Sequence, residues 1–489
     1  MERRTFLKIL SSAGIVSLVS PTFAMGVCKN KVSKSSSALL ESAFRNPPFS
    51  SGVYTWWHWM NGNITKDGIT RDLEAMKANG IAGYQLFEAG SGIPIGPVES
   101  LSDEWVDLIL HTLKESERLG LEFAMHNCPG WSSSGGPWIT PDKAMQIITW
   151  SETKVTGGKQ VRIQLPTPKH MFDYYIDTYC LAIPANMKVI PRLSILELSN
   201  KLDKGGVLTW DVPAGEWLIM RFGQTAKDQK NKSAPSKSTG LDCDKFSTEA
   251  LDYHLNCMFK RLMPAMEKIA KHSKIGLLID SYETGDQDWT SDMPAYFEQN
   301  HGYALYPFLP VLANKIIESE ESTKRFKYDF RRTRADMFAE RYYGHFQKRC
   351  KEKGIITYTE PYGGNMMEEL QVAQQLDINM GEFWCGQTVL WANYKYNRTV
   401  KQVASISHTL GGKIVGAEAF TSEPDADKWL LYPYALKSLG DYMFTRGLNR
   451  IYFHRFAHQP HPTAAPGMTM GAWGLHFDRT NTCLLYTSP

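Results

Sequence analysis

The sequence lacks the motifs of several common enzyme classes. Its eight cysteines are scattered without a C-x-x-C pair, so neither a zinc ribbon nor a thioredoxin-like redox site is indicated. No H-E-x-x-H motif occurs, which disfavours a zinc hydrolase. G-x-S-x-G and P-loop patterns are also missing at the ends of the strand-like runs, which argues against an esterase or a nucleotide hydrolase.

The chain also has little net charge and no long hydrophobic run. A formal charge of +3 over 489 residues, with no basic stripe interleaved with aromatics, argues against nucleic-acid binding. The apolar run 9–19 contains Ser and Gly and is too short to form a stable membrane span. With 43% hydrophobic and 21% charged residues, the composition is that of an ordinary soluble globular protein.

The N-terminus has the pattern of an export signal. The paired arginines Arg3-Arg4 and Thr-Phe-Leu-Lys precede the apolar run, and Thr22-Phe-Ala24 provides small residues at the spacing of a cleavage site. We predict an export signal over residues 1–27, of the twin-arginine type, and hence a periplasmic protein. A general secretion signal is the alternative, and Cys28 leaves an outer-membrane lipoprotein open. Residues 28–50 are rich in Ser and Lys and are predicted to be a linker.

Four strand-like runs in the second half of the chain each end on an acid. They are Leu277-Leu-Ile-Asp-Ser-Tyr-Glu283, Ile356-Thr-Tyr-Thr-Glu360, Ile378-Asn-Met-Gly-Glu382 and Ile414-Val-Gly-Ala-Glu418. Helical stretches separate them. Parallel strands of an α/β barrel deliver their C-terminal ends to one rim, where active sites lie. We therefore expect these distant carboxylates to share one pocket.

Further runs complete a barrel pattern. Together with the four acid-ended runs, the strand candidates are 53–59, 82–87, 121–126 and 450–455. Because they alternate with helical spacing, we predict an α/β fold of the (β/α)8 TIM-barrel type. Barrel strands one to three fall in 51–146 and strands four to eight in 241–482. The last outer helix is expected to be missing, and residues 483–489 are expected to be a non-native tail.

Between strands three and four the helical spacing gives way to alternation. Val161-Arg-Ile-Gln-Leu165 alternates apolar and polar residues, and Trp217-Leu-Ile-Met-Arg221 is a short apolar run that ends on Arg, with Pro and Gly between such runs. This pattern predicts short strands. We predict an inserted β-rich module, which together with the polar loop 227–238 occupies residues 147–240.

A cluster of acids at one rim suits two kinds of chemistry. Glycoside hydrolysis needs one protonated carboxyl for the leaving oxygen and one ionised carboxylate that activates water or attacks the anomeric carbon. Four or five acids at close range raise one another's pKa and cannot all stay ionised unaided. Bound Ca²⁺ relieves such repulsion with oxygen ligands. Mg²⁺ or a network of Arg and Lys is the competing explanation, with Arg455 nearest in register.

Other polar and aromatic residues fall at the same rim. His58, His126 and His454 end strands one, three and eight, where they could bind sugar hydroxyls. A turn at Asn61 follows strand one. The tryptophans that border the rim are Trp57, Trp59, Trp131 and Trp384. We expect one of these rings to be a platform for a sugar.

Seven motifs, in order from about residue 48 to 482, resemble those of glycoside hydrolase family 106, the bacterial α-L-rhamnosidases. They are Tyr54-Thr-Trp-Trp-His-Trp-Met-Asn-Gly62, Gly68-Ile-Thr-Arg-Asp-Leu-Glu-Ala-Met76, Asp280-Ser-Tyr-Glu-Thr-Gly285, Glu360-Pro-Tyr-Gly-Gly364, Met380-Gly-Glu-Phe-Trp384, Ala417-Glu-Ala-Phe-Thr421 and His454-Arg-Phe-Ala-His-Gln-Pro460. The resemblance implies an exo-acting, inverting, calcium-assisted α-L-rhamnosidase that acts on a carbohydrate.

The resemblance also implies a role for each matching residue. Glu283 would be the general acid, Asp280 its supporting carboxylate and Glu418 the general base. Glu382 would help to hold the calcium, and Glu360, in the Glu-Pro-Tyr motif, is a second candidate ligand. The expected substrate-binding residues are Trp57, His58, Asn61, His126, Tyr282, Trp384 and His454.

Inversion of configuration makes a geometric prediction. The carboxyls of Glu283 and Glu418 should stand about 6.5–9.5 Å apart, whereas a retaining pair would be about 5–5.5 Å apart. Two alternatives stay open at this point. One is a glycosidase of other sugar specificity, since a barrel fold alone does not name the sugar. The other is a catalytically inactive carbohydrate-binding barrel.

Overall fold

The computed structural model describes residues 34–90, 92–132, 134–260, 262–270, 275–385, 389–423, 431–465, 467–471 and 475–479. The chain divides into two units, one ending at Gly52 and one beginning at Val53. In the first, the predicted linker contains a helix, α2 (Lys34–Arg45), and a short 3₁₀ turn, η1 (Phe49–Ser51). The predicted export signal and C-terminal tail lie outside the described residues.

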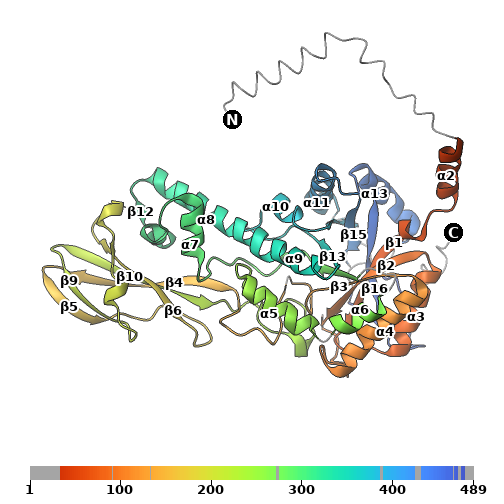
Figure 1. Cartoon of the computed structure of the whole chain (residues 1–489), viewed down its shortest axis with the longest axis horizontal. Coiled ribbons are helices and arrows are strands. Elements are labelled where there is room, and N and C mark those ends of the chain that lie inside the picture. Colours follow the sequence, from red (N-terminus) through yellow and green to blue (C-terminus); the bar gives the residue numbers. More distant parts are fainter. Residues whose placement is uncertain are drawn as a thin grey trace, which may run out of the picture. The chain divides into compact units, whose positions relative to one another are not determined.

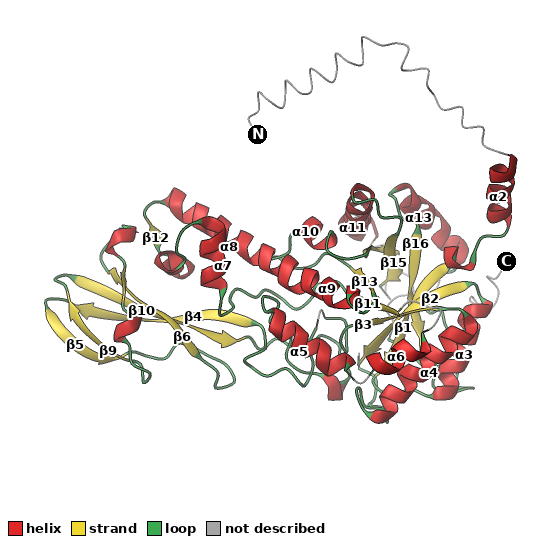
Figure 2. Ribbon diagram, viewed as in Figure 1, coloured by secondary structure: helices red, strands yellow, loops and turns green. Residues whose placement is uncertain are grey.

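The second unit contains a closed barrel of parallel strands in the order β1-β16-β15-β14-β13-β11-β3-β2. The strands are β1 (Val53–Met60), β2 (Ile81–Ala89), β3 (Glu122–His126), β11 (Ile275–Ile279), β13 (Ile356–Thr359), β14 (Ile378–Cys385), β15 (Val415–Ser422) and β16 (Arg450–Ala457). Parallel pairing of β1 with β16 closes the barrel. Helices surround these strands (Figure 2), so the predicted (β/α)8 fold is confirmed.

The helices of this unit begin and end at recognisable signals. They are α3 (Lys66–Ala78), α4 (Asp103–Leu119), α5 (Thr248–Phe259), α6 (Met263–Ile269), α7 (Met293–His301), α8 (Glu320–Met337), α9 (His345–Lys351), α10 (Glu369–Ala373), α11 (Val389–Thr409) and α13 (Pro433–Thr445). Thr65 caps α3 by accepting a hydrogen bond from the Gly68 N–H, and Ser102 caps α4 in the same way. Gly120 ends α4 in the left-handed conformation, with φ +67°, which glycine adopts without strain.

An antiparallel β module interrupts the barrel between β3 and β11, as the alternating runs predicted (Figure 1). Its strands are β4 (Gln146–Thr156), β5 (Lys159–Gln164), β6 (Ile176–Pro184), β7 (Val189–Ile190), β8 (Leu196–Glu197), β9 (Val207–Val212) and β10 (Glu216–Ala226). One sheet has the order β4-β10-β6-β8, and β5 pairs with β9. Leu208, Trp210 and Ile219 belong to its own hydrophobic core. After β11 the chain returns to this module, where β12 (Ile316–Ile317) pairs with β7.

The polar loop that follows β10 runs back over the barrel loops of β1, β2 and β3. Its backbone carbonyls accept hydrogen bonds from other loops: Lys232 O from the Trp131 N–H at 3.1 Å, and Ser233 O from the Gly90 N–H at 2.8 Å. The Ser236 N–H donates to Asn61 Oδ1 at 3.1 Å. Three barrel loops therefore fix a segment that the sequence places more than a hundred residues downstream.

No helix in the described part of the chain is both long and apolar enough to cross a bilayer.

Candidate active site

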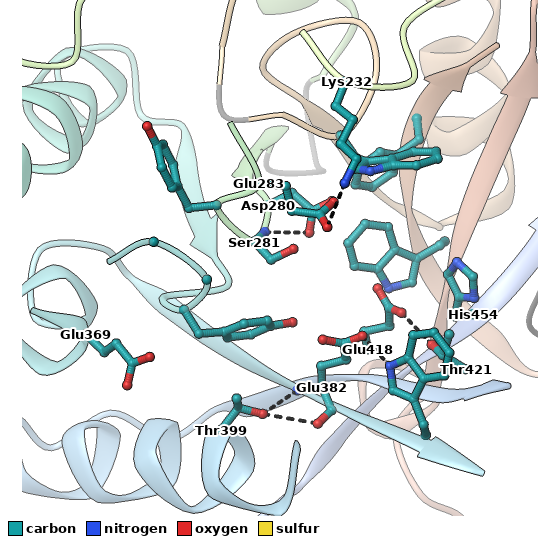
Figure 3. A pocket seen from close by; sticks show the side chains of 18 of the residues that line it. Lys232, Asp280, Ser281, Glu283, Glu369, Glu382, Thr399, Glu418, Thr421 and His454 are labelled. Atoms are coloured by element: carbon teal, nitrogen blue, oxygen red, sulfur yellow. Dashed lines mark hydrogen bonds and ion pairs between the residues drawn. The ribbon is translucent and has the colours of Figure 1, made fainter. Parts of the chain in front are cut away.

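A cavity of about 1090 Å³ opens at the C-terminal ends of the barrel strands. Its wall includes residues that follow or end β1, β2, β11, β14, β15 and β16, together with Lys232 from the loop after β10. Figure 3 shows several of these side chains projecting into one space. The cavity therefore lies where parallel α/β barrels build their sites.

Neighbouring strands supply the acids of this cavity. Asp280 and Glu360 come directly after β11 and β13, while Glu382 and Glu418 lie within β14 and β15. Glu382 and Glu418 are direct neighbours in the register of the β14–β15 pair. Since β11, β13, β14 and β15 are consecutive around the barrel, four carboxyls line or underlie one side of its mouth. We call this the acidic arc.

Asp280 and Glu360 form the buried end of the acidic arc. Burial raises the pKa of Asp280 to about 8, against the opposing effect of hydrogen bonds from Glu360 and from the Ser281 N–H. Burial, followed by the charges of Asp280 and Glu418, raises the pKa of Glu360 well above its usual range. Tyr362 Oη donates to Glu360 Oε2 at 2.6 Å. Two hydrogen-bonded buried carboxyls cannot both ionise, so this pair shares a proton.

Glu418 and Glu382 form the open end of the acidic arc. Thr421 Oγ1 donates to Glu418, and Trp384 Nε1 donates to Glu382. Burial raises the pKa of Glu418 well above its usual range, and the charges of Glu382 and Asp280 raise it further. Glu418 therefore stands in an environment that disfavours its own negative charge.

A β-bulge explains how Thr421 reaches Glu418. Residues three apart on a regular strand face opposite sides. In the β14–β15 pair, Phe383 is opposite Ala419 and Trp384 is opposite Thr421, so Phe420 is an extra residue. Phe420 has φ +63°. The bulge turns Thr421 back to the cavity side, where its hydroxyl holds the Glu418 carboxylate.

Glu283 is the most exposed of the predicted acids. Its side chain is 37% exposed, and Lys232 Nζ lies 3.3 Å from Glu283 Oε1. In Figure 3, Glu283 lies beside Lys232 and Asp280, while Glu418 lies on the side of Thr421 and His454. The two candidate catalytic carboxylates thus enter one cavity from different sides.

Three of the four remaining barrel strands, β16, β1 and β2, carry uncharged rings at the cavity. Trp56 and His58 of β1, Phe87 of β2 and His454 of β16 line the cavity. We call these four residues the ring arc. The Trp56 and Phe87 ring centroids are 4.2 Å apart, and those of His58 and His454 are 5.6 Å apart. These rings face the cavity from the strands opposite the acidic arc.

The two histidines of the ring arc are neutral. Burial lowers the pKa of His58 well below its usual range, and the neighbouring His454 and Arg455 lower it further. Burial and the Arg455 charge do the same for His454. The Nδ1 atoms of both rings are buried without a hydrogen-bond partner among the described residues. Both residues line the cavity, and a neutral imidazole can exchange hydrogen bonds with a sugar hydroxyl.

Three predicted substrate-binding residues do not line the cavity. The ring of β1 that lines the cavity is Trp56 and not the predicted Trp57, because successive strand residues face opposite ways. Trp57 Nε1 instead donates to Asp72 at 3.3 Å. Asn61 is a loop residue that binds the Ile93 carbonyl and the Ser236 N–H. His126 lies behind Asp280, with Nε2 3.3 Å from the Asp280 N–H. Each of them supports the site rather than facing it.

Other predicted residues do reach the cavity. Tyr282 and Trp384 line it, and Tyr282 Oη donates to the Gly285 carbonyl at 2.6 Å. Glu360 does not line it, since it lies buried behind Asp280. Arg455, considered as a counterion for the acids, is fully buried and hydrogen-bonds to Thr469 and Gly471.

Sequence reasoning missed several residues of the cavity. Strict alternation from His58 would have selected Trp56, and alternation on β2 would have selected Phe87. Lys232 lies in a polar loop without a local signal of its position. Arg398 and Glu369 form a 2.9 Å ion pair that also lines the cavity.

The fit of a metal ion can be judged from the donor atoms. Among the described residues, no three His, Cys, Asp or Glu side chains are grouped as a metal site. The acidic arc nevertheless offers carboxylate oxygens, which are the ligands that hard cations prefer. Burial, followed by the charges of Glu382 and Asp280, raises the pKa of Glu418, and a cation would relieve the repulsion between these charges. The donor chemistry therefore fits Ca²⁺, with further ligands required from outside these side chains.

Comparison with known proteins finds a matching family model and a named related protein. The model of glycoside hydrolase family 106, described as alpha-L-rhamnosidase, matches residues 45–178 and 169–489. A protein of Formosa agariphila named "Putative beta-glucuronidase" is 40% identical over 474 residues, which cover 91% of this chain. The chain spans only 40% of that relative's length.

A solved structure shows the same fold. It is a rhamnosidase from Novosphingobium sp. PP1Y, with a TM-score of 0.81 and 24% sequence identity. The match covers 90% of this chain and 58% of that one. The family match spans the barrel, the β module and the acidic arc, and the chain belongs to glycoside hydrolase family 106.

Proposed function

We propose that this protein is an exo-acting, inverting α-L-rhamnosidase that removes terminal α-L-rhamnose from a polysaccharide or glycoside. The observation that carries the proposal is that Glu283, in the loop after β11, and Glu418, on β15, line one cavity. A pair of carboxyls on two sides of a sugar site is the equipment for glycoside hydrolysis. Membership of family 106, whose model is described as alpha-L-rhamnosidase, supports rhamnose as the sugar.

In the proposed reaction Glu283 is the general acid and Glu418 the general base. Glu418 takes a proton from a water whose oxygen attacks the anomeric carbon. The bond from that carbon to the glycosidic oxygen breaks, and Glu283 gives its proton to the leaving oxygen. Attack opposite the leaving group inverts the configuration. A separation of about 6.5–9.5 Å between the two carboxyls stays the geometric prediction.

The neighbouring residues have supporting roles in this proposal. Asp280 stands beside Glu283, and its raised pKa lets it hold a proton near the general acid. Thr421 orients Glu418 through its hydroxyl. His58 and His454 line the cavity, and their proposed role is to bind sugar hydroxyls through their imidazole rings. Trp384 adds an aromatic surface, while its indole N–H holds Glu382.

Calcium remains part of the proposal. Glu382 is the proposed protein ligand, because it lines the cavity next to Glu418, and sugar hydroxyls would complete the coordination. When bound, the ion would supply positive charge that favours the ionised form of the acids around it. Glu360, the second predicted ligand, lies behind Asp280, so its proposed role is to hold Asp280 through the shared proton.

Two other functions are kept as alternatives. The name of the Formosa agariphila relative makes a β-glucuronide the rival substrate. A catalytically inactive carbohydrate-binding barrel is the rival from another class. The proposal also includes export to the periplasm, which cell fractionation with and without residues 1–27 would test.

A panel of aryl glycosides tests the proposed function directly. The full-length gene product should release the aryl group from α-L-rhamnoside, and NMR of the first sugar released should show the β anomer. Chelation should lower the rate, and added Ca²⁺ should restore it. Release from β-D-glucuronide alone would favour the rival enzyme. Rhamnoside binding without turnover would favour the inactive barrel, and turnover that survives thorough chelation would remove calcium from the account.

A further inference from the structure

The ring arc contains an apolar wall that the proposed reaction does not use. Trp56 and Phe87 are each 1% exposed, and both line the cavity. Their centroids are 4.2 Å apart, and Phe87 also stacks on His126 at 4.9 Å. In the β1–β2 register, His58 is directly opposite Phe87. The wall is therefore rigid, because two strands and a stack of rings hold it.

The described residues that line the cavity include no unpaired Lys or Arg side chain. The two residues of this kind are Lys232 and Arg398. Each is at least half exposed, and each is paired with an acid, Glu283 or Glu369. Burial lowers the pKa of both histidines of the ring arc, which favours their neutral forms. A carboxylate on a bound sugar would thus find no unpaired Lys or Arg among the described residues that line the cavity.

We infer that the Trp56–Phe87 wall receives the C6 methyl group of a 6-deoxy sugar and selects against a C6 hydroxyl or carboxylate. This inference rests on the proposed function, which it deepens. A methyl group gains by leaving water for an apolar surface. A hydroxyl there would lose its hydrogen bonds to water without replacement. A carboxylate would cost still more to desolvate against this wall, which separates a rhamnosidase from a glucuronidase on physical grounds.

L-Mannose is the sharpest probe of this wall, because it differs from L-rhamnose only by a hydroxyl on C6. Binding of methyl α-L-rhamnoside and methyl α-L-mannoside to the Glu283→Gln variant, measured by titration calorimetry, separates recognition from turnover. We expect about 10- to 100-fold tighter binding of the rhamnoside. In the wild type the same ratio should appear in kcat/KM for the two p-nitrophenyl glycosides.

Two variants locate the discrimination. Phe87→Tyr adds a phenolic hydroxyl beside the proposed methyl position, so the rhamnoside preference should fall several-fold through better binding of the mannoside. Trp57→Phe changes the neighbouring ring on the opposite face of β1 and should leave the preference unchanged. Thermal unfolding of both variants checks that they fold.

The outcomes distinguish this inference from the proposed function. Equal affinity for the two sugars, or a preference that survives Phe87→Tyr and disappears in Trp57→Phe, would overturn the role of the wall even if rhamnosides are hydrolysed. Selective binding of rhamnoside without hydrolysis would support the wall while the proposed function fails. Binding of β-D-glucuronide in preference to both sugars would overturn both.

Discussion

The two sides of the barrel mouth differ in their titratable groups, which are acids on one side and histidines on the other, although burial acts on both. On the acidic arc, burial raises the pKa of Asp280, Glu360 and Glu418. On the ring arc, burial lowers the pKa of His58 and His454. Both shifts favour neutral side chains. The acids differ from the histidines because their negative charges also repel one another. A proton or a cation bound among them therefore has a large effect on the pKa of the others.

The difference separates chemistry from recognition. The acidic arc contains groups whose protonation can change during a reaction, whereas the ring arc contains rings and neutral imidazoles that can only bind. A change on the acidic arc should therefore act on kcat, and one on the ring arc should act on KM and on the choice of sugar. Substitutions on each side test whether kcat and KM respond separately in this way.

The largest effects should come from the candidate catalytic carboxyls. Glu283→Gln and Glu418→Gln should each lower kcat on a nitrophenyl rhamnoside by about 10²- to 10⁴-fold, because proton transfer is lost. A dinitrophenyl leaving group needs little protonation. It should therefore rescue Glu283→Gln and leave Glu418→Gln inactive, which steady-state kinetics would show.

Glu369→Gln is the matched control for these variants. Glu369 lines the same cavity but pairs with Arg398, outside the acidic arc. Its kcat should stay within a few-fold of the wild type. A loss as large as that of Glu418→Gln would mean that the effect is not specific to the candidate catalytic carboxyls. Rescue of Glu418→Gln rather than Glu283→Gln by the better leaving group would reverse their roles.

A smaller effect is expected from the histidines of the ring arc. His58→Ala and His454→Ala should each raise KM about 2- to 10-fold, since one hydrogen bond contributes about 0.5–1.5 kcal/mol. His58→Gln can still donate a hydrogen bond and should recover part of the loss. Kinetics over a range of substrate concentration separate KM from kcat. A fall confined to kcat would place His58 in the chemistry and break the division between the two arcs.

The acidic arc should also make folding stability depend on pH. Burial raises the pKa of Asp280 to about 8, whereas an unfolded Asp titrates near ~3.9. Between these values the folded chain keeps a proton that the unfolded chain has lost. The free energy of unfolding should therefore fall as pH rises from about 4 to about 8. Glu360, with its pKa also raised, acts in the same direction.

Urea unfolding at the two ends of this range measures the slope. Asp280→Asn cannot ionise, so its stability should fall less with rising pH than that of the wild type. Asp441→Asn, which removes an exposed carboxylate paired with Lys437, should keep the wild-type slope. Equal slopes for Asp280→Asn and the wild type would show that Asp280 does not hold the proton.

Local patterns were enough to predict the barrel and the convergence of the acids on its mouth. Strand periodicity, helix caps such as Thr65 and the acids at strand ends depend on neighbours in the sequence. The predicted ring is Trp57, whereas Trp56 lines the cavity. Alternation along β1 puts Trp56 on the same face as His58 and Trp57 on the other face, so the sequence contains the information that identifies Trp56.

Other parts of the site depend on contacts that no local pattern contains. Thr421 reaches Glu418 through a bulge at Phe420, which the sequence of β15 does not reveal. Lys232 reaches the mouth because its carbonyl accepts a hydrogen bond from the Trp131 N–H, about a hundred residues away in the chain. Such long-range backbone contacts form only once the β module and the barrel loops are both folded.

The smallest effect should come from Lys232, and it tests whether the loop after β10 takes part in the chemistry. Lys232 and Glu283 are 50% and 37% exposed, and ion pairs of this kind contribute about 0–1 kcal/mol. Lys232→Met should therefore change kcat/KM by only a few-fold and leave the unfolding temperature unchanged. Kinetics at low and high salt provide the internal control, because salt should weaken the pair in the wild type and have less effect in the variant. If Lys232→Met instead loses as much activity as Glu283→Gln, the loop after β10 takes part in the chemistry. The β module would then be needed for catalysis as well as for the architecture of the mouth.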